Sequence, residues 1–314
     1  MCRTSLFLTV APEEQGMKLL RFLERRLGGG APKSMLHKWI RTGQVRVNKG
    51  RAGPHQLLNE GDTVRLPPFA EARHVEREPG AKQGHAQEVP DLGPGLRIIG
   101  QSADYMALGK SAGLPTQSGN AHRDSVAQRL RAAFKDAPFI PAPAHRLDTQ
   151  TSGLILAGRN HPAQQRLHEA FRKNTARREY LAWVPGSWPH EQAILLRDTL
   201  ERGSPVQALC VALPVQYLES HKATLLLVRL ITGRKHQIRV QLASRHFPVI
   251  GDARYGGPPF PLMLLHAYAL SLPPENGETG SAWSLPPEWP APFMPDAAAL
   301  NPALRLPLGS LEAL

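Results

Sequence analysis

The sequence predicts an α+β protein with a small basic module at residues 1–68 and a larger domain at 94–272. Three observations support this division. Apolar residues recur at helix and strand spacing in the module, all apolar periodicity is lost over residues 69–93, and strand and helix patterns then resume. We therefore expect residues 69–93 to form a flexible linker, and the prolines crowded into residues 273–314 predict an extended C-terminal extension.

The module combines two short helices with strands. Leucines and Phe22 at helical spacing predict a helix over 19–27, which the following glycines end. A second helix begins near Ser34 and ends before Gly43. Alternating residues at 45–47 and 63–66 predict strands, with a turn after the first of them.

Most of the excess positive charge lies in this module. Residues 16–68 hold 11 Lys and Arg against 3 Asp and Glu, which is +8 of the net +12 of the chain. A surplus this concentrated favours a nucleic-acid-binding face over an ordinary solvated surface, and no basic amphipathic helix supports a membrane surface as the partner. The candidate RNA-binding residues are Lys33, Lys38, Arg41, Arg46, Lys49 and Arg51.

Composition narrows the class of protein. The chain is 41% apolar and 20% charged, as is typical of a globular protein. Cys2 and Cys210 have no metal-ligand spacing and predict no disulfide framework. The apolar run at residues 6–10 is too short for a signal peptide, and no stretch is long enough to span a bilayer. We expect a cytoplasmic protein.

The larger domain mixes strands and helices. Residues 96–99 and 225–231 have strand patterns, whereas 126–134 and 163–171 have helical spacing. Between the two helices lies His145-Arg-Leu-Asp-Thr-Gln-Thr-Ser-Gly153, which places Asp148 in a turn after an arginine and before an apolar strand. A carboxylate in a tight turn beside a cation can stay ionised and act as a nucleophile, although an Asp in a turn often only bonds its own backbone. The segment Thr232–Arg239 could supply the required cation.

Four ordered blocks resemble one known family. The first block is His145-Arg-Leu-Asp148 with Thr151-Ser-Gly153, and the second is Arg178-Glu-Tyr-Leu-Ala182. The third runs from Thr232-Gly-Arg234 through His236-Gln-Ile-Arg239 to Gly251–Gly256, and the fourth is Leu265-His-Ala267. Together the blocks resemble the RluA-type pseudouridine synthases. Residues 16–68 resemble the S4 RNA-binding domain, most closely in the RluC-like subgroup that modifies large-subunit ribosomal RNA. The resemblance implies a catalytic domain built on a mixed, largely antiparallel bent sheet flanked by helices.

The resemblance also implies an activity. The protein would be an isomerase that converts uridine to pseudouridine in 23S ribosomal RNA, as a monomer and without a metal or cofactor. The family's roles make Asp148 the nucleophile or covalent catalyst and Arg239 its charge partner. Tyr180 stacks on the uracil and is a candidate for removing its C5 proton. Arg146 fills the gap left by the flipped nucleotide, Ile238 forms an apolar wall, and Lys110 and His236 are further substrate-binding residues. For His236, as for His145, a structural hydrogen bond is favoured over a catalytic or metal-ligand role.

Several alternatives stay open. Departures from the family pattern occur at Leu20, Ser111, Gln150 and the short segment 201–211. They lend weight to a catalytically idle RNA-binding or ribosome-assembly factor, and a tRNA-directed synthase is a further possibility. A glycoside hydrolase that uses Asp148 and Glu179 would require the two carboxylates to face each other across a groove. Whether Asp148 attacks the sugar, attacks the base or abstracts a sugar proton is undecided.

Overall fold

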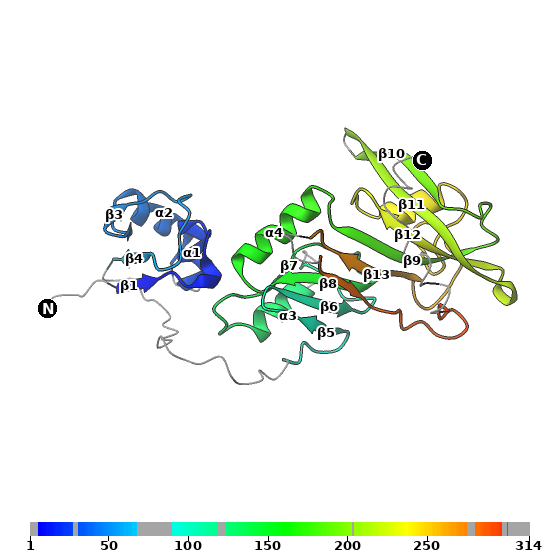
Figure 1. The fold of residues 1–314 in the computed structure, drawn as a ribbon, viewed down its shortest axis with the longest axis horizontal. Coiled ribbons are helices and arrows are strands. Elements are labelled where there is room, and N and C mark those ends of the chain that lie inside the picture. The colour runs from blue at the N-terminus through cyan, green and yellow to red at the C-terminus, as the bar shows by residue number, and fades with distance from the viewer. Residues whose placement is uncertain are drawn as a thin grey trace. The chain divides into compact units, whose positions relative to one another are not determined.

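A computed structural model describes residues 6–27, 31–67, 90–118, 124–202, 204–274, 280–296 and 300. The chain folds into two compact units, each with its own sheet (Figure 1). The first unit comprises Met1–Pro90, Arg131–Ala142 and Gly158–Arg166, and the second comprises Asp91–Leu130, Pro143–Ala157 and Leu167–Leu314.

The first unit packs two helices on a four-stranded sheet. Its elements are β1 (Leu6–Thr9), the 3₁₀ turn η1 (Pro12–Glu14), α1 (Leu19–Arg26), α2 (Lys33–Arg41), β2 (Arg46–Val47), β3 (Gly50–Arg51) and β4 (Thr63–Leu66). The strands pair antiparallel in the order β1-β4-β2-β3. Both predicted helices and the predicted turn are confirmed; Asn48 and Lys49 have positive φ, as the two central residues of a tight hairpin turn require. β1 was not predicted as a strand.

Helical spacing explains the core of this unit. α1 and α2 each bury one apolar face, because residues three and four apart lie on the same side of a helix. The buried residues include Leu19, Phe22, Leu23, Leu36, Trp39, Ile40, Val45 and Val64. The predicted RNA-binding side chains stay outside this core; five of the six are exposed and Arg46 is half-buried.

The other elements surround a second, larger sheet. They are β5 (Leu96–Gln101), β6 (Tyr105–Lys110), α3 (Val126–Ala133), β7 (Ala142–Pro143), β8 (Ser152–Gly158), α4 (His161–Arg172), β9 (Arg177–Pro185), β10 (Ile194–Arg202), β11 (Ser204–Leu218), η2 (Glu219–His221), β12 (Ala223–Leu230), α5 (Gln237–Ala243), β13 (Leu265–Ser271) and β14 (Ala282–Ser284). The main strand order is β10-β11-β12-β9-β13-β8-β6-β5. Pairing is antiparallel from β10 to β13 and between β5 and β6, whereas β13 and β8 run parallel. This is the mixed sheet that the family resemblance implies.

The side chains of the central strand β9 alternate between the two faces of the sheet. Successive side chains of a strand point to opposite sides, so Leu181 and Trp183 share one face while Arg178 and Tyr180 share the other. Leu181 and Trp183 belong to a buried cluster with residues of β12 and with Phe293, whose carbonyl accepts a hydrogen bond from Trp183 Nε1 at 2.8 Å. Part of the expected C-terminal extension therefore covers one face of the sheet.

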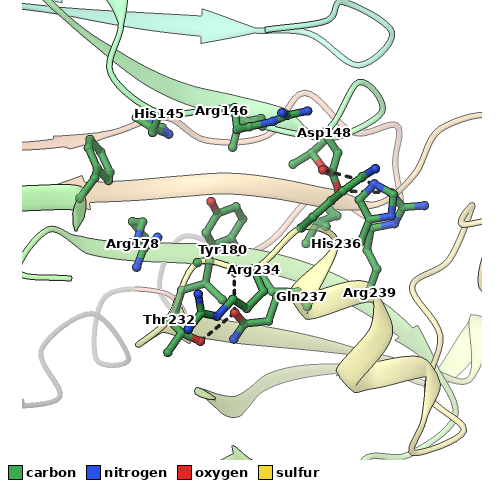
Figure 2. A pocket seen from close by; sticks show the side chains of 18 of the residues that line it. His145, Arg146, Asp148, Arg178, Tyr180, Thr232, Arg234, His236, Gln237 and Arg239 are labelled. Carbon is green, nitrogen blue, oxygen red and sulfur yellow. Dashed lines mark hydrogen bonds and ion pairs between the residues drawn. The ribbon is translucent and has the colours of Figure 1, made fainter. Parts of the chain in front are cut away.

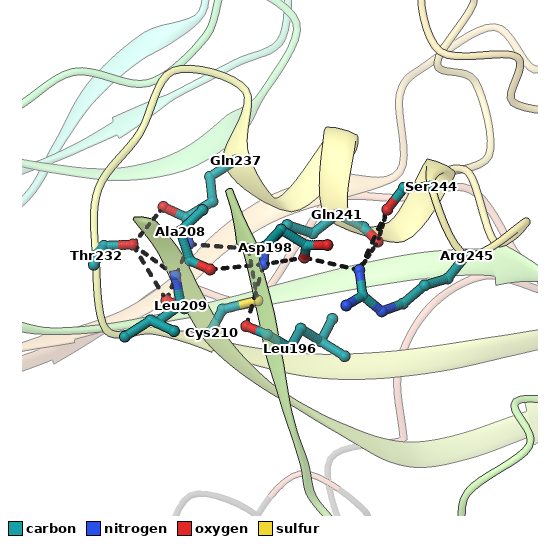
Figure 3. A network of polar contacts seen from close by, with 10 residues as sticks. All are labelled: Leu196, Asp198, Ala208, Leu209, Cys210, Thr232, Gln237, Gln241, Ser244 and Arg245. Carbon is teal, nitrogen blue, oxygen red and sulfur yellow. Dashed lines mark hydrogen bonds and ion pairs between the residues drawn. The ribbon is translucent and has the colours of Figure 1, made fainter. Parts of the chain in front are cut away.

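A buried polar network fixes α5 on the β10–β11 hairpin (Figure 3). Gln241 is fully buried, and its Nε2 donates to Asp198 Oδ2 at 2.7 Å and to the carbonyls of Leu196 and Ala208. Its Oε1 accepts from Cys210 Sγ and from Gln237 Nε2. Because buried polar groups are costly when unpaired, these bonds hold the helix in one position. The helix carries Ile238 and Arg239 into the candidate site.

The described part of the chain contains no helix that is long and apolar enough to cross a membrane.

Candidate active site

Asp148 lies in a turn between β7 and β8 that several bonds hold in place. Thr151 N donates to Asp148 O at 3.1 Å, and the Thr116 hydroxyl bonds both the N–H and the carbonyl of Leu147. At the start of β8, Gly153 has φ +117°, and a Cβ at this position would lie 2.3 Å from Ala267 O of β13. Only glycine permits this close approach of the two strands, so the sequence Thr-Ser-Gly determines where the turn lies.

Arg239 connects Asp148 to a second carboxylate that the sequence analysis did not assign. Arg239 Nη1 donates to Asp148 Oδ2 at 3.2 Å, while Nε and Nη2 donate to the two oxygens of Asp252 at 2.6 and 2.8 Å. Burial acts to lower the pKa of Arg239, but the bonds to Asp252 and Asp148 outweigh it and hold this pKa above its usual value. The predicted pairing of Arg239 with Asp148 is thus present, with Asp252 as the anchor.

His236 approaches Asp148 from the N-terminal end of α5. Its Nε2 lies 3.6 Å from Asp148 Oδ1, too far for a hydrogen bond, and its Nδ1 bonds the Tyr255 hydroxyl at 2.9 Å. Burial lowers the pKa of His236, and Asp148 opposes this effect. Tyr255 also contacts Arg239, whose guanidinium carbon lies 5.0 Å from the ring centre. Tyr255 lay within a motif of the sequence but had no predicted role.

Tyr180 lies beside this ion pair, on the same face of β9 as Arg178, and is buried. Burial raises the pKa of its phenol to about 12, an effect that Arg178 opposes and Asp148 reinforces. The hydroxyl is therefore protonated at neutral pH. This state suits an aromatic ring that stacks on a base better than it suits a proton acceptor.

These side chains surround one cavity of about 430 Å³ (Figure 2). This volume falls within the usual range of small-molecule sites. Five predicted site residues besides Asp148 line it, namely Arg146, Tyr180, His236, Ile238 and Arg239. Six of the lining residues are cations: Arg146 and Arg239, already named, together with Arg172, Arg178, Arg234 and Lys235. Asp148 is the one carboxylate among the lining residues described. The cavity therefore suits an anionic ligand whose reacting atom meets a single carboxylate.

Lys110 is the predicted substrate-binding residue that lies outside this lining. Its Nζ donates to the carbonyls of Ser111, Leu114 and Thr149, at 2.9, 2.8 and 3.0 Å, which occupies its three protons. Burial lowers the pKa of Lys110 to about 7, against the opposing effect of Asp148. Its observed contacts are therefore with the backbone beside the turn that carries Asp148, and not with the cavity.

His145 has the structural bond that the sequence analysis favoured. Its Nε2 accepts from Leu156 N at 3.1 Å, and burial lowers its pKa to about 3, so the ring is neutral. Within the described ranges, no group of three or more His, Cys, Asp or Glu residues could hold a metal ion.

The glycoside hydrolase alternative is wrong, because its second carboxylate points away. Glu179 lies on the opposite face of β9 from Tyr180, outside the cavity, and its Oε1 pairs with Arg177 and Arg229. A strand places neighbouring residues on opposite faces, so Asp148 and Glu179 do not face each other across a groove.

Comparisons with known proteins find similar sequences and a similar fold. A family model described as RNA pseudouridylate synthase matches residues 104–244. The chain is 33% identical over 293 residues to ribosomal large subunit pseudouridine synthase C of Yersinia pestis, covering 87% of this chain and 89% of that protein. It is 34% identical over 270 residues to the protein of the same name from Escherichia coli K12, covering 83% and 82% of the two chains. The structure of human RNA pseudouridylate synthase domain containing 1 covers 74% of this chain and 98% of its own, with a TM-score of 0.57 and 21% identity, which shows a shared fold.

Proposed function

This chain belongs to the RNA pseudouridylate synthase family, and we propose that it isomerises uridines of large-subunit ribosomal RNA to pseudouridine. The observation that carries the proposal is the ion pair of Asp148 with Arg239, at the wall of a cationic cavity that also contains Tyr180. One buried guanidinium orients one carboxylate in a site whose lining also contains five other cations and the ring of Tyr180. That arrangement fits a polyanionic substrate with a flat base.

In the proposed reaction the N-glycosidic bond breaks, the uracil turns within the cavity, and C5 joins C1′. Asp148 is the catalytic carboxylate, and Arg239 orients it through their hydrogen bond. Tyr180 stacks on the uracil, and Ile238 forms an apolar wall beside it. Uridine in a helix shields its reactive atoms, so the nucleotide must flip out, and Arg146 fills the gap that it leaves.

The substrate class rests on the named relatives and on the charge of the first unit. Ribosomal large subunit pseudouridine synthases of two bacteria align over more than four fifths of this chain. We propose that residues 1–68 form an S4-like RNA-binding domain, joined by a linker at 69–93 to a catalytic domain at 94–272 with an extension at 273–314. The exposed cations of α2 and the β2–β3 hairpin support contacts with RNA phosphates.

Tritium release tests this function. Forming the C5–C1′ bond expels the hydrogen from C5, so RNA labelled there loses tritium on each turnover. Unmodified 23S rRNA and a tRNA pool are assayed side by side, with the Asp148→Asn protein as the control. We expect release from 23S rRNA alone and none with Asp148→Asn. Release from tRNA alone would overturn the substrate, and binding without release from either RNA would favour an idle RNA-binding factor.

A further inference from the structure

Arg178 is a buried cation of the cavity with an unused hydrogen-bond donor. Its side chain is 9% exposed, its Nη2 donates to Asn174 Oδ1 at 3.2 Å, and its Nε has no partner. It lies beside Tyr180 on the same face of β9 (Figure 2). A buried charge normally has a counter-ion, and a buried donor normally has an acceptor. Because Nε itself is covered by protein atoms, a ligand in the cavity meets the guanidinium through its other N–H groups, and it can supply the counter-charge that Arg178 lacks.

Neighbouring carboxylates do not supply that acceptor. Glu179 faces the other side of β9 and pairs with Arg177 and Arg229. Asp148 pairs with Arg239, the other buried cation of the cavity, which is anchored by Asp252 as well. In the part of the chain that the structure describes, no carboxylate forms an ion pair with Arg178.

The depth of Arg178 selects which part of a nucleotide can reach it. A flipped nucleotide enters a pocket base first, and its phosphates stay with the RNA chain at the rim. Four other cations of the cavity are exposed and suit phosphates at that rim, namely Arg146, Arg172, Arg234 and Lys235. Beside the ring of Tyr180, on which the base stacks, a buried N–H instead meets the edge of the base. The acceptors on the edge of uracil are its carbonyl oxygens, O2 and O4.

The reaction makes those oxygens negative. When the C1′–N1 bond breaks, its electron pair stays with the uracil, and the charge spreads from N1 to O2 and O4. A half-turn about the N3–C6 axis then exchanges N1 with C5 and O2 with O4. A fixed donor therefore meets a carbonyl oxygen at the same place before and after the turn. C5 bonds to C1′, the C5 proton leaves to solvent or a base, and N1 takes up a proton.

We propose that Arg178 is a catalytic residue whose guanidinium group donates to a uracil carbonyl oxygen and stabilises the negative charge of the detached base. This inference rests on the proposed function. A fixed donor that meets charge as it develops in a site shielded from water acts like an oxyanion hole. Loss of one such donor typically slows an enzyme by about 10²–10³-fold.

The test is the single-turnover rate of tritium release at saturating enzyme, together with the Kd for the same RNA. Arg178→Met should lower the maximal rate by about 10²–10³-fold and leave Kd within about threefold, because the bond strengthens only as charge develops. Lys173→Met is the control, since that side chain is 56% exposed, pairs with Glu169 and is not among the residues that line the cavity; its maximal rate should stay near that of the wild type.

Two further measurements separate catalysis from folding. Arg178→Lys keeps the buried charge without the planar guanidinium group and should remain at least tenfold slower than wild type if its melting temperature is preserved. Guanidinium ion, added to Arg178→Ala at concentrations harmless to the wild type, should restore part of the rate. Such rescue is not expected of a merely structural residue.

The contrary outcomes are distinct. A maximal rate for Arg178→Met or Arg178→Lys within threefold of a working wild type would overturn the role of Arg178 alone. A weakened Kd with an unchanged maximal rate would assign Arg178 to an RNA phosphate and also overturn it. Absence of release by the wild type from any RNA would overturn the proposed function and this inference together.

Discussion

Replacing Arg239 should damage stability and activity through two different carboxylates. Arg239 is 7% exposed and forms ion pairs with two carboxylates. The side chain of Asp252 is 1% exposed and that of Asp148 is 21% exposed. Arg239→Met leaves the buried charge of Asp252 without its partner, which typically costs about 3–5 kcal/mol of unfolding free energy. Asp148 loses its orienting cation in the same variant, so tritium release should fall strongly.

The double variant Arg239→Met with Asp252→Asn separates the two effects. It removes the unpaired buried charge, and replacing both partners of a buried ion pair is often close to neutral. We expect it to regain most of the lost stability while activity stays low, because Asp148 still lacks its partner.

Urea unfolding followed by tryptophan fluorescence measures the stability, since Trp183, Trp188, Trp283 and Trp289 lie in the second unit and Trp39 alone lies in the first. Tritium release measures the activity. Recovery of activity in the double variant, or an unchanged stability in the single variant, would refute the reasoning.

Three other predictions concern the turn, the buried histidines and the basic module. Gly153→Ala should destabilise the second unit by more than about 2 kcal/mol, because the new Cβ meets Ala267 O at positive φ; Gly256→Ala, with positive φ but open space, should cost less in the same urea titration. His145 and His266 have pKa values lowered by burial to about 3 and about 4, so the unfolded chain binds more protons below pH 6.5. The free energy of unfolding is therefore not reduced by these rings above pH 6.5, and it falls as the pH drops towards 4, by up to about 1.4 kcal/mol per pH unit for each ring. A His266→Gln variant whose free energy of unfolding falls with pH as steeply as that of the wild type would contradict this account. Lys38→Glu with Arg41→Glu should weaken RNA binding and reduce the slope of log Kd against log salt by about 2, measured by filter binding, and unaltered binding would remove α2 from the RNA contact.

Local patterns in the sequence predicted most elements of the first unit. The leucine spacing of 19–27 was sufficient for α1, because a helix buries residues three and four apart whatever it packs against. The strand β1 was missed, since its alternating burial depends on pairing with β4 nearly sixty residues later. The resemblance to a family brought Asp148, Tyr180 and Arg239 together, although 91 residues separate the two members of the ion pair.

The sequence by itself determined the type of protein, the turn that carries Asp148 and the concentration of positive charge before residue 68. Only the tertiary structure decided the partners of the buried charges. In the structure Arg239 pairs with Asp252, and Glu179 lies outside the cavity, where it pairs with Arg177. Lys110 binds backbone carbonyls beside the cavity, and the Nε of Arg178 has no hydrogen-bond partner. Spacing along a chain specifies which face of an element a side chain occupies. Which charge it meets there depends on strand pairings between distant segments, and these are set by the packing of the whole sheet.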